Sequence, residues 1–138
     1  MEEPTVISGS VSVDNRGSIR YVNEFNFNDV KRFYHVKNHS TSFVRGWYGH
    51  KEEKLYVYVS RGTASVGVVS MDDEESKRTF VLSMQRPRIL YIPPGHWHAF
   101  KTLEQDTCVV FFSSLTLQES QRNLKRKSWN EWNVWSVG

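Results

Sequence analysis

The sequence contains one cysteine, no long hydrophobic run and only a small excess of positive charge. Cys108, within the apolar run TCVVFF, has no second cysteine to pair with, so it is predicted to be a small buried side chain in a protein of a reducing compartment. No stretch approaches the ~18 apolar residues that a membrane-spanning helix needs. The N-terminus, MEEPTV, is acidic where a signal peptide is basic, and we therefore expect a cytoplasmic protein with no membrane partner.

The length of 138 residues predicts one domain over residues 1–138, with a core at about 10–120 and a tail at 121–138. The formal net charge is +3, and Lys and Arg are scattered except for the KRK at 125–127. This balance argues against a nucleic-acid partner, which would need a continuous basic surface. A pocket for a small anionic ligand fits the same excess of charge.

The dominant hydrophobic period is two, which is typical of β-strands. Leu55, Val57 and Val59 alternate with Tyr and Ser, Arg61-Gly62 supplies a turn, and residues 63–68 alternate again, so residues 55–68 are predicted to form a β-hairpin. Further strands are expected in TVISGSVSV, SIRYVNEF, KRFYHV, RTFVLS, RILYIP and TCVVFFSS. Many short strands with turn residues between them predict an antiparallel sandwich or barrel.

The end of the chain breaks this pattern. Only LTLQESQRNLKRK, residues 115–127, is compatible with a short helix. Trp129, Trp132 and Trp135 then follow at intervals of three, and exposed indoles would favour aggregation. We expect them to pack against the barrel or against a second subunit.

Two segments carry candidate chemistry. In RILYIPPGHWHAF an apolar strand ends in Pro93-Pro94-Gly95, and His96 and His98 follow on one face of the next extended segment. Upstream, SFVRGWYGHKEEK places Tyr48 and His50 two residues apart, just before an alternating strand. Histidines on a turn are often plain surface residues, but the two segments together suggest one pocket.

The order of these motifs resembles the deoxysugar cupins. This RmlC-like family includes dTDP-4-dehydrorhamnose 3,5-epimerases and dTDP-sugar 3,4-ketoisomerases. The resemblance covers about residues 14–119 and rests on VDNRGSI, KRFYHV, NHSTS, RGWYGHK, KLYVYVSRG, FVLS, LYIPPGHWHAF and FFSSLTLQES. It implies an all-β fold, a single cupin (jelly-roll) barrel followed by a short helical or irregular tail, in which the two histidine segments face each other across the barrel mouth.

Metal-binding cupins carry H-x-H followed by Glu in the first motif. Here those positions hold Tyr48, His50 and Lys54, and an ammonium group raises the cost of binding a cation. We therefore predict no metal and no other cofactor. A metal-dependent cupin enzyme, with His50, His98 and His96 as ligands, remains the alternative.

The resemblance implies removal of a proton next to the C4 ketone of a nucleotide-linked 4-keto-6-deoxy sugar, which needs a base and a group that stabilises the oxyanion. Tyr48 occupies the position of the family's usual base. Three accounts follow. The base is His50; or Tyr48, with Lys54 or Arg45 stabilising its phenolate, protonates or deprotonates the opposite face of the sugar; or catalysis is lost and a nucleotide-sugar-binding protein remains. His98, from the second motif, completes the set of catalytic candidates.

Substrate binding is assigned by the same resemblance. A dTDP-sugar is the expected partner, and guanidinium groups suit its diphosphate. The substrate-binding candidates are Arg16, Asn38, Arg45, Trp47 and His96. The family also implies a homodimer, in a pathway to a surface polysaccharide or a glycosylated metabolite.

The second-face acid of the epimerases has no counterpart in this sequence. In those enzymes a Tyr follows on the strand after the second motif, whereas here Phe111 and Phe112 occupy that neighbourhood. A proton shuttle on one face of the sugar, as in ketoisomerisation or a single epimerisation, is therefore easier to support than a double epimerisation.

Overall fold

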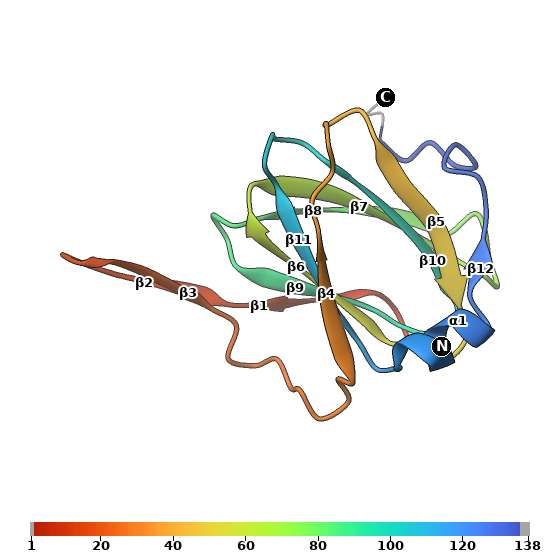
Figure 1. Cartoon of the computed structure of the whole chain (residues 1–138), viewed down its shortest axis with the longest axis horizontal. Helices are drawn as coiled ribbons and strands as arrows, with labels where there is room; N and C mark the ends of the chain where they lie inside the picture. Colours follow the sequence, from red (N-terminus) through yellow and green to blue (C-terminus); the bar gives the residue numbers. More distant parts are fainter. Residues whose placement is uncertain (1, 136–138) are drawn as a thin grey trace.

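The computed structural model describes residues 2–135, and its fold is built almost entirely from β-strands (Figure 1). Two five-stranded antiparallel sheets face each other, in the orders β1-β9-β6-β11-β4 and β12-β5-β10-β7-β8, and a separate two-stranded sheet pairs β2 with β3. The all-β prediction is confirmed. The elements are β1 Thr5–Ser8, β2 Ser10–Asp14, β3 Gly17–Tyr21, β4 Arg32–Val36, β5 Val44–His50, β6 Leu55–Arg61, β7 Thr63–Ser70, β8 Lys77–Ser83, β9 Arg88–Ile92, β10 His96–Thr102, β11 Cys108–Ser113, α1 Leu117–Arg122 and β12 Lys125–Arg126.

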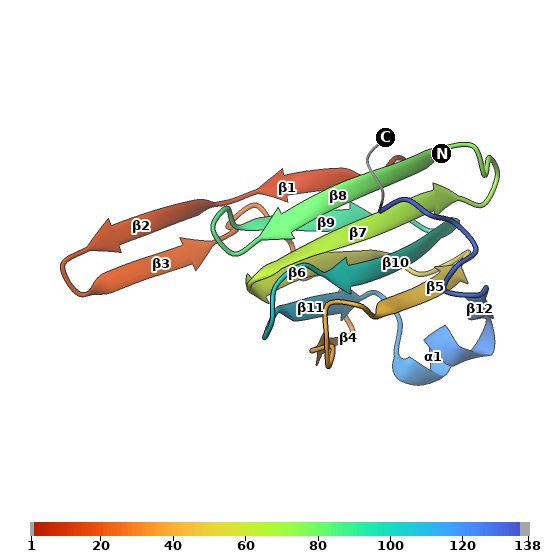
Figure 2. The same cartoon turned by 90° about the horizontal axis from the view of Figure 1, so that it is seen from above.

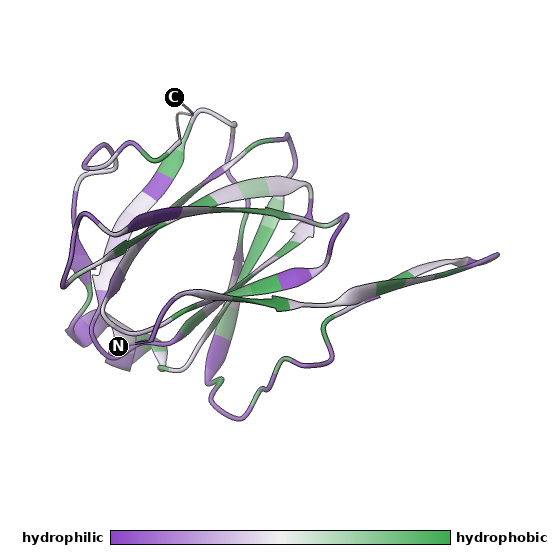
Figure 3. Ribbon diagram, turned by 180° about the vertical axis from the view of Figure 1, so that it is seen from behind, coloured by the Kyte–Doolittle hydropathy of each residue, from purple (hydrophilic) through white to green (hydrophobic). Residues whose placement is uncertain are grey.

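The barrel interior is filled by the apolar side chains that alternate along the strands. Leu55, Val57 and Val59 of β6 are almost completely buried, and Val66 and Val68 of β7 face them from the other sheet. Burying a side chain of this size contributes about 1.5–3 kcal/mol. Figure 3 shows the hydrophobic residues concentrated on the barrel strands, with mostly hydrophilic loops between them.

The predicted hairpin over residues 55–68 is wrong. Its two strands form as expected, but β6 pairs with β9 and β11, whereas β7 pairs with β10 and β8 in the opposite sheet. Gly62, with φ +81°, turns the chain from one sheet to the other, and a Cβ there would collide with Thr107. Alternation along a strand does not reveal whether the following turn joins neighbours or changes sheet.

The β2–β3 hairpin projects away from the barrel (Figures 1 and 2). The expected strand TVISGSVSV divides at Gly9 into β1, which joins the barrel, and β2, which leaves it. Val13 and Ile19 of the hairpin are exposed by 73% and 66%. An isolated two-stranded hairpin is marginally stable in water, and exposed apolar residues are typical of a surface that contacts another molecule.

The C-terminal segment is a short helix followed by residues 123–135, here called the strap, which cross the second sheet. Helix α1 begins with a capping box formed by Thr116 and Glu119 and is shorter than the 115–127 predicted. Trp132 and Trp135 pack on Trp47, as expected for the tail, whereas Trp129 is exposed. No helix within residues 2–135 is long and apolar enough to span a membrane.

Candidate active site

A pocket of about 370 Å³ opens between the two sheets at the end of the barrel that α1 borders. Its inner wall comes from β4, β5, β10 and β11, and its outer wall comes from α1 and the strap. The lining residues are Tyr34, Val36, Arg45, Tyr48, Glu53, His98, Phe100, Phe111, Leu117, Ser120, Gln121, Leu124 and Arg126. Of the nine residues predicted for the site, the pocket contains Tyr48, His98 and Arg45.

A β-bulge directs Tyr48 and His98 into this pocket. On β5 and β10 His98 pairs with Tyr48 but Ala99 pairs with Gly46, so Trp47 is the extra residue. Gly46 is required there because it lies at φ +144° and a Cβ would collide with Ala99. The rings of Tyr48 and His98 are consequently neighbours, with centroids 6.0 Å apart.

The surroundings of His98 disfavour the charged form of its imidazole. Burial lowers its pKa from 6.5 to about 4, and the charge of Glu53 opposes that shift. The imidazole is therefore neutral at pH 7 and has a free lone pair. A neutral imidazole that borders a pocket is able to accept a proton from a ligand.

Tyr34 adds a second hydroxyl that the sequence analysis did not assign to the site. Its ring stacks on Phe111 with centroids 5.1 Å apart, because the two residues pair across β4 and β11. Burial, followed by the charge of Glu53, raises the pKa of Tyr34 to about 12, so the phenol stays protonated and acts as a donor. The alternation within KRFYHV, which places Tyr34 and Val36 on one face, was the available signal.

Two arginines lie at the pocket. Arg45 is exposed, and its Nε donates to Asn38 Oδ1 at 2.7 Å, so the buried Asn38 orients the guanidinium without lining the pocket itself. Arg126 of β12 lies over the Tyr48 ring, with 6.0 Å between Cζ and the ring centroid. The strap places it there, since Lys127 and Trp47 exchange backbone hydrogen bonds of 3.0 and 3.2 Å.

His50 and His96 border a different space. They line a small cavity of about 10 Å³ beside the pocket, together with Glu53 and His98. His50 Nδ1 accepts the backbone N–H groups of Glu52 and Glu53 at 3.0 and 3.2 Å, which fixes the proton of the neutral ring on Nε2. That Nε2–H group is buried and has no hydrogen-bond partner within residues 2–135. As placed, His50 is a donor and has no lone pair for a substrate proton.

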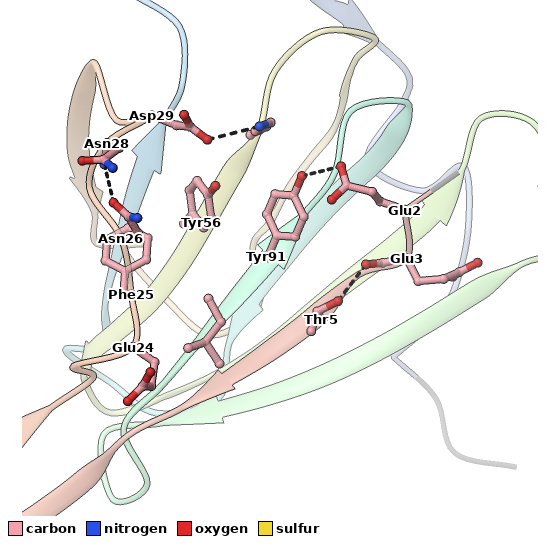
Figure 4. Close-up of a pocket in the computed structure, with 12 residues that line it drawn as sticks. Glu2, Glu3, Thr5, Glu24, Phe25, Asn26, Asn28, Asp29, Tyr56 and Tyr91 are labelled. Carbon is pink, nitrogen blue, oxygen red and sulfur yellow. Dashed lines mark hydrogen bonds and ion pairs between the residues drawn. The ribbon is translucent and has the colours of Figure 1, made fainter.

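Lys54, predicted as a catalytic residue, lies on the opposite surface of the first sheet. Its neighbour Leu55 points inward, so Lys54 points out of the barrel, where Nζ bonds Asp29 Oδ2 at 3.1 Å. Figure 4 shows this outer hollow, in which Tyr56 and Tyr91 lie beside several carboxylates. Lys54 therefore stabilises no phenolate at Tyr48.

Trp47 and Arg16 also lie apart from the pocket. Trp47 faces the outer side of β5, where it is completely buried against Val69, Trp97 and the strap. Arg16 lies at the tip of the β2–β3 hairpin, is highly exposed and bonds Asp14 Oδ2 at 2.7 Å. Neither residue contacts a ligand in the pocket of its own chain.

A model of the family described as FdtA, WxcM-like, C-terminal matches residues 3–128. The chain belongs to this family. The match confirms the resemblance to deoxysugar cupins that the ordered motifs suggested. No curated protein sequence matches the chain.

Several solved structures share this fold. A 3,4-ketoisomerase from Helicobacter canadensis is 19% identical, with 92% of each chain covered and a TM-score of 0.74. The QdtA 3,4-ketoisomerase from Thermoanaerobacterium thermosaccharolyticum, in complex with TDP, is 17% identical over 90% of this chain and 88% of that chain, with a TM-score of 0.73. The dTDP-4-dehydrorhamnose 3,5-epimerase from Bacillus anthracis, with TDP and PPi bound, is 19% identical over 93% and 80%, with a TM-score of 0.79. The predicted RmlC-like cupin barrel is thereby confirmed.

The donor set of the pocket is dominated by imidazole, phenol and guanidinium groups. Among residues 2–135 no group of three or more His, Cys, Asp or Glu side chains is arranged to hold a metal ion. The Nδ1 lone pair of His50 accepts two backbone N–H groups, which leaves it unavailable to a cation. The side chains of the pocket are suited to binding an anion and moving a proton.

Proposed function

We propose that this protein is an isomerase of a nucleotide-linked 4-keto-6-deoxy sugar, with dTDP as the expected nucleotide. The observation that carries the proposal is the convergence of a neutral imidazole, two phenols and two guanidinium groups on one pocket of about 370 Å³. The family match and the sugar ketoisomerases and epimerases among its structural neighbours support the same chemistry.

His98 is the base in this proposal. It takes a proton from the carbon beside the C4 ketone, the C–H electron pair forms the C=C bond of an enolate, and the negative charge moves to the ketone oxygen. Tyr48 or Tyr34 donates a hydrogen bond to that oxyanion. When the proton comes from C3, ketoisomerisation follows if the proton of the C3 hydroxyl moves to the C4 oxygen and the carbon-bound proton returns to C4, which leaves a ketone at C3 and a hydroxyl at C4. Return of a proton to the original carbon from the other side gives epimerisation.

The geometry favours His98 over His50 as the base. His98 lines the pocket, whereas His50 lines only the small cavity beside it and has its acceptor nitrogen occupied by two backbone N–H groups. Phe111 stands where the sequence comparison expected the second acid of the epimerases, and Tyr34 on the neighbouring strand supplies the nearest hydroxyl group. We assign His50 to holding the 50–53 turn and Tyr34 to proton donation.

Arg45 and Arg126 are assigned to the diphosphate. Replacing Asn38 with Ala removes the acceptor that orients Arg45, so we expect the Kd for dTDP to rise about 5- to 10-fold, which corresponds to about 1–1.4 kcal/mol, the size of one typical hydrogen bond. Isothermal titration calorimetry measures the change. An Asn38→Ala variant that binds dTDP as tightly as the wild type would show that Arg45 needs no such support.

The reaction is tested by incubating the protein with dTDP-4-keto-6-deoxyglucose in heavy water and following the sugar carbons by NMR. We expect deuterium at a carbon next to the C4 ketone, and for ketoisomerisation a 3-keto carbon together with a hydroxylated C4 that carries hydrogen or deuterium. Tight dTDP binding without any exchange would instead favour the non-catalytic nucleotide-sugar-binding protein.

The hairpin supports a homodimer in which the copies complete each other. Its exposed Val13 and Ile19 gain cover only against another surface, and Arg16 at its tip approaches a pocket only if that pocket belongs to a second copy. Replacing both Val13 and Ile19 with Asp is therefore expected to convert a dimer into a monomer. Light scattering after size exclusion measures this change; an unaltered mass would place the interface elsewhere.

Arg16 gives this arrangement a sharper test. An Arg16→Ala variant and a His98→Gln variant are each expected to be nearly inactive, because one lacks the hairpin arginine and the other the base. In a mixed dimer, one of the two pockets combines an intact His98 with an intact Arg16 from the other chain. Random pairing of equal amounts makes about half of the dimers mixed, so the mixture should regain up to about a quarter of the wild-type exchange rate. No recovery after confirmed subunit exchange would contradict binding by Arg16 across the interface.

A further inference from the structure

Glu53 is a buried carboxylate at the boundary between the pocket and the small cavity beside it. It lines both spaces and is only 8% exposed. Burying an unpaired carboxylate costs several kcal/mol, so such a group needs dedicated partners. Here Ser113 Oγ, itself completely buried, donates to Glu53 Oε2 at 2.5 Å, and Arg32 Nη2 lies 3.6 Å from the same oxygen.

The two partners fix the position of the carboxylate. Ser113 also accepts the N–H of Leu115 at 3.1 Å, which ties it to the chain beyond β11. Arg32 is shared, because its guanidinium also lies 4.8 Å from the centre of the Tyr34 ring. Both interactions engage Oε2, and no hydrogen bond to Oε1 is found within residues 2–135. The carboxylate is thus oriented but not fully neutralised.

His98 borders both of the spaces that Glu53 borders. The other polar side chains beside it are Tyr48 and His50 of β5, His96 of β10 and Tyr34 of β4, none of which is a carboxylate. Arg32, Arg45 and Arg126 surround the pocket with positive charge, which opposes any second cation inside it. Glu53 is the one acidic residue among those that line the pocket.

A buried imidazole surrounded by arginines resists protonation, yet a base must become a cation when it takes a proton. The free energy of that imidazolium limits the reaction, and a fixed negative charge nearby lowers it. Burial depresses the pKa of His98, and the charge of Glu53 is the effect that acts in the opposite direction. Glu53 therefore supplies the negative charge that the other residues of the pocket lack.

We propose that Glu53 is a positioning residue for proton transfer, whose carboxylate stabilises the imidazolium of His98 while the substrate carbon is deprotonated. This inference rests on the proposed function. The proton passes from the sugar carbon to the ring nitrogen of His98, the electron pair remains in the enolate, and Glu53 stays ionised throughout. The proton returns from His98 to a sugar carbon or exchanges with solvent.

The test replaces Glu53 with Gln, which keeps the size of the side chain and an acceptor for Ser113 but removes the charge. We expect the deuterium exchange rate to fall by at least about 10-fold, with the Kd for dTDP within 2-fold of the wild type. Glu53→Asp, which retains the charge, should recover part of the rate. Glu52→Gln is the matched control, since Glu52 is exposed and its N–H also bonds His50 Nδ1.

A second measurement needs no substrate. The imidazole of His98, followed by NMR of ¹⁵N-labelled protein, should titrate at lower pH in Glu53→Gln than in the wild type. Equal midpoints would overturn the inference, as would a Glu53→Gln variant that exchanges deuterium at the wild-type rate. If the wild type shows no exchange at all, the proposed reaction fails, but the two midpoints still decide whether Glu53 acts on His98. Should Glu53→Gln not fold, Ser113→Ala, which keeps the charge but frees the carboxylate, is expected to give a smaller loss of rate in the same direction; no loss would overturn the inference.

Discussion

Replacing His98 with Gln should lower the rate of deuterium exchange by about 10²–10⁴-fold, the usual contribution of a positioned general base. The loss is expected in the chemical step, because His98 lies in the pocket beside Tyr48, whereas the proposed diphosphate contacts are Arg45 and Arg126. The Kd for dTDP should therefore change by less than 3-fold. Exchange is measured by NMR and binding by calorimetry.

The pH dependence of the wild type tests the role of His98. With a pKa of about 4, His98 stays deprotonated above pH 5, so a rate that depends on it should be nearly constant between pH 5.5 and 7.5. A rate that instead drops as the pH falls from 7.5 to 5.5 would indicate a base with the reference histidine pKa of ~6.5 and contradict the assignment to His98. A His98→Gln variant that retains its activity, together with an inactive His50→Gln variant, would return the role of base to His50.

Replacing Trp47 with Ala should lower the free energy of unfolding by about 3–5 kcal/mol, the range for removing a large buried aromatic side chain. Trp47 is completely buried and contacts Trp132 edge-on and Trp135 in a stacked arrangement, with ring centroids 5.1 and 6.1 Å away. Its loss also removes the seat of the strap that brings Arg126 to the pocket. Urea denaturation followed by fluorescence or circular dichroism measures the change.

Two variants control this prediction. Trp129→Ala removes an indole from the same strap, but Trp129 is exposed, so the free energy of unfolding should change by no more than about 0.5 kcal/mol. Trp47→Phe should cost much less than Trp47→Ala, because it keeps most of the buried ring and removes a buried indole N–H that has no partner within residues 2–135. If Trp47→Ala weakens dTDP binding while leaving stability unchanged, Trp47 is a ligand-binding residue as the sequence first suggested.

The strands and the family were predictable from the sequence, because the patterns that mark them lie in short stretches of neighbouring residues. Strand alternation requires only neighbouring residues, and residues 55–60, 78–83 and 108–113 all lie within strands. Sheet membership depends on contacts distant in the chain, so the crossover at Gly62 was interpreted as a hairpin. The strand β5 was not predicted, because its glycines and bulge interrupt the alternation that marks a strand.

The site was predictable only in part, for a related reason. The motifs identified Tyr48, His98 and Arg45, which lie in β5 and β10 and line the pocket. Lys54 and Trp47 belong to the same motif but point out of the barrel. Lys54 lies on the face of the sheet opposite to its inward-pointing neighbour Leu55, and Trp47 lies at the bulge.

Glu53 and Arg126 came from segments without a periodic signal. Glu53 follows β5 in an irregular turn that the His50 ring stabilises, and Arg126 arrives from a two-residue strand in the tail. Their contribution depends on tertiary contacts with Ser113 and Trp47, which no local pattern specifies.

The account is tested most directly by a crystal structure of the protein with a dTDP-linked 6-deoxy sugar that carries a hydroxyl group at C4 and so cannot enolise. The sugar should lie among Tyr34, Tyr48 and His98, with a carbon next to C4 about 3–3.5 Å from a ring nitrogen of His98, the spacing of a reactive complex. The diphosphate should contact Arg45 or Arg126. A sugar ring whose nearest imidazole is His50, or one bound in the outer hollow beside Tyr56 and Tyr91, would contradict the account.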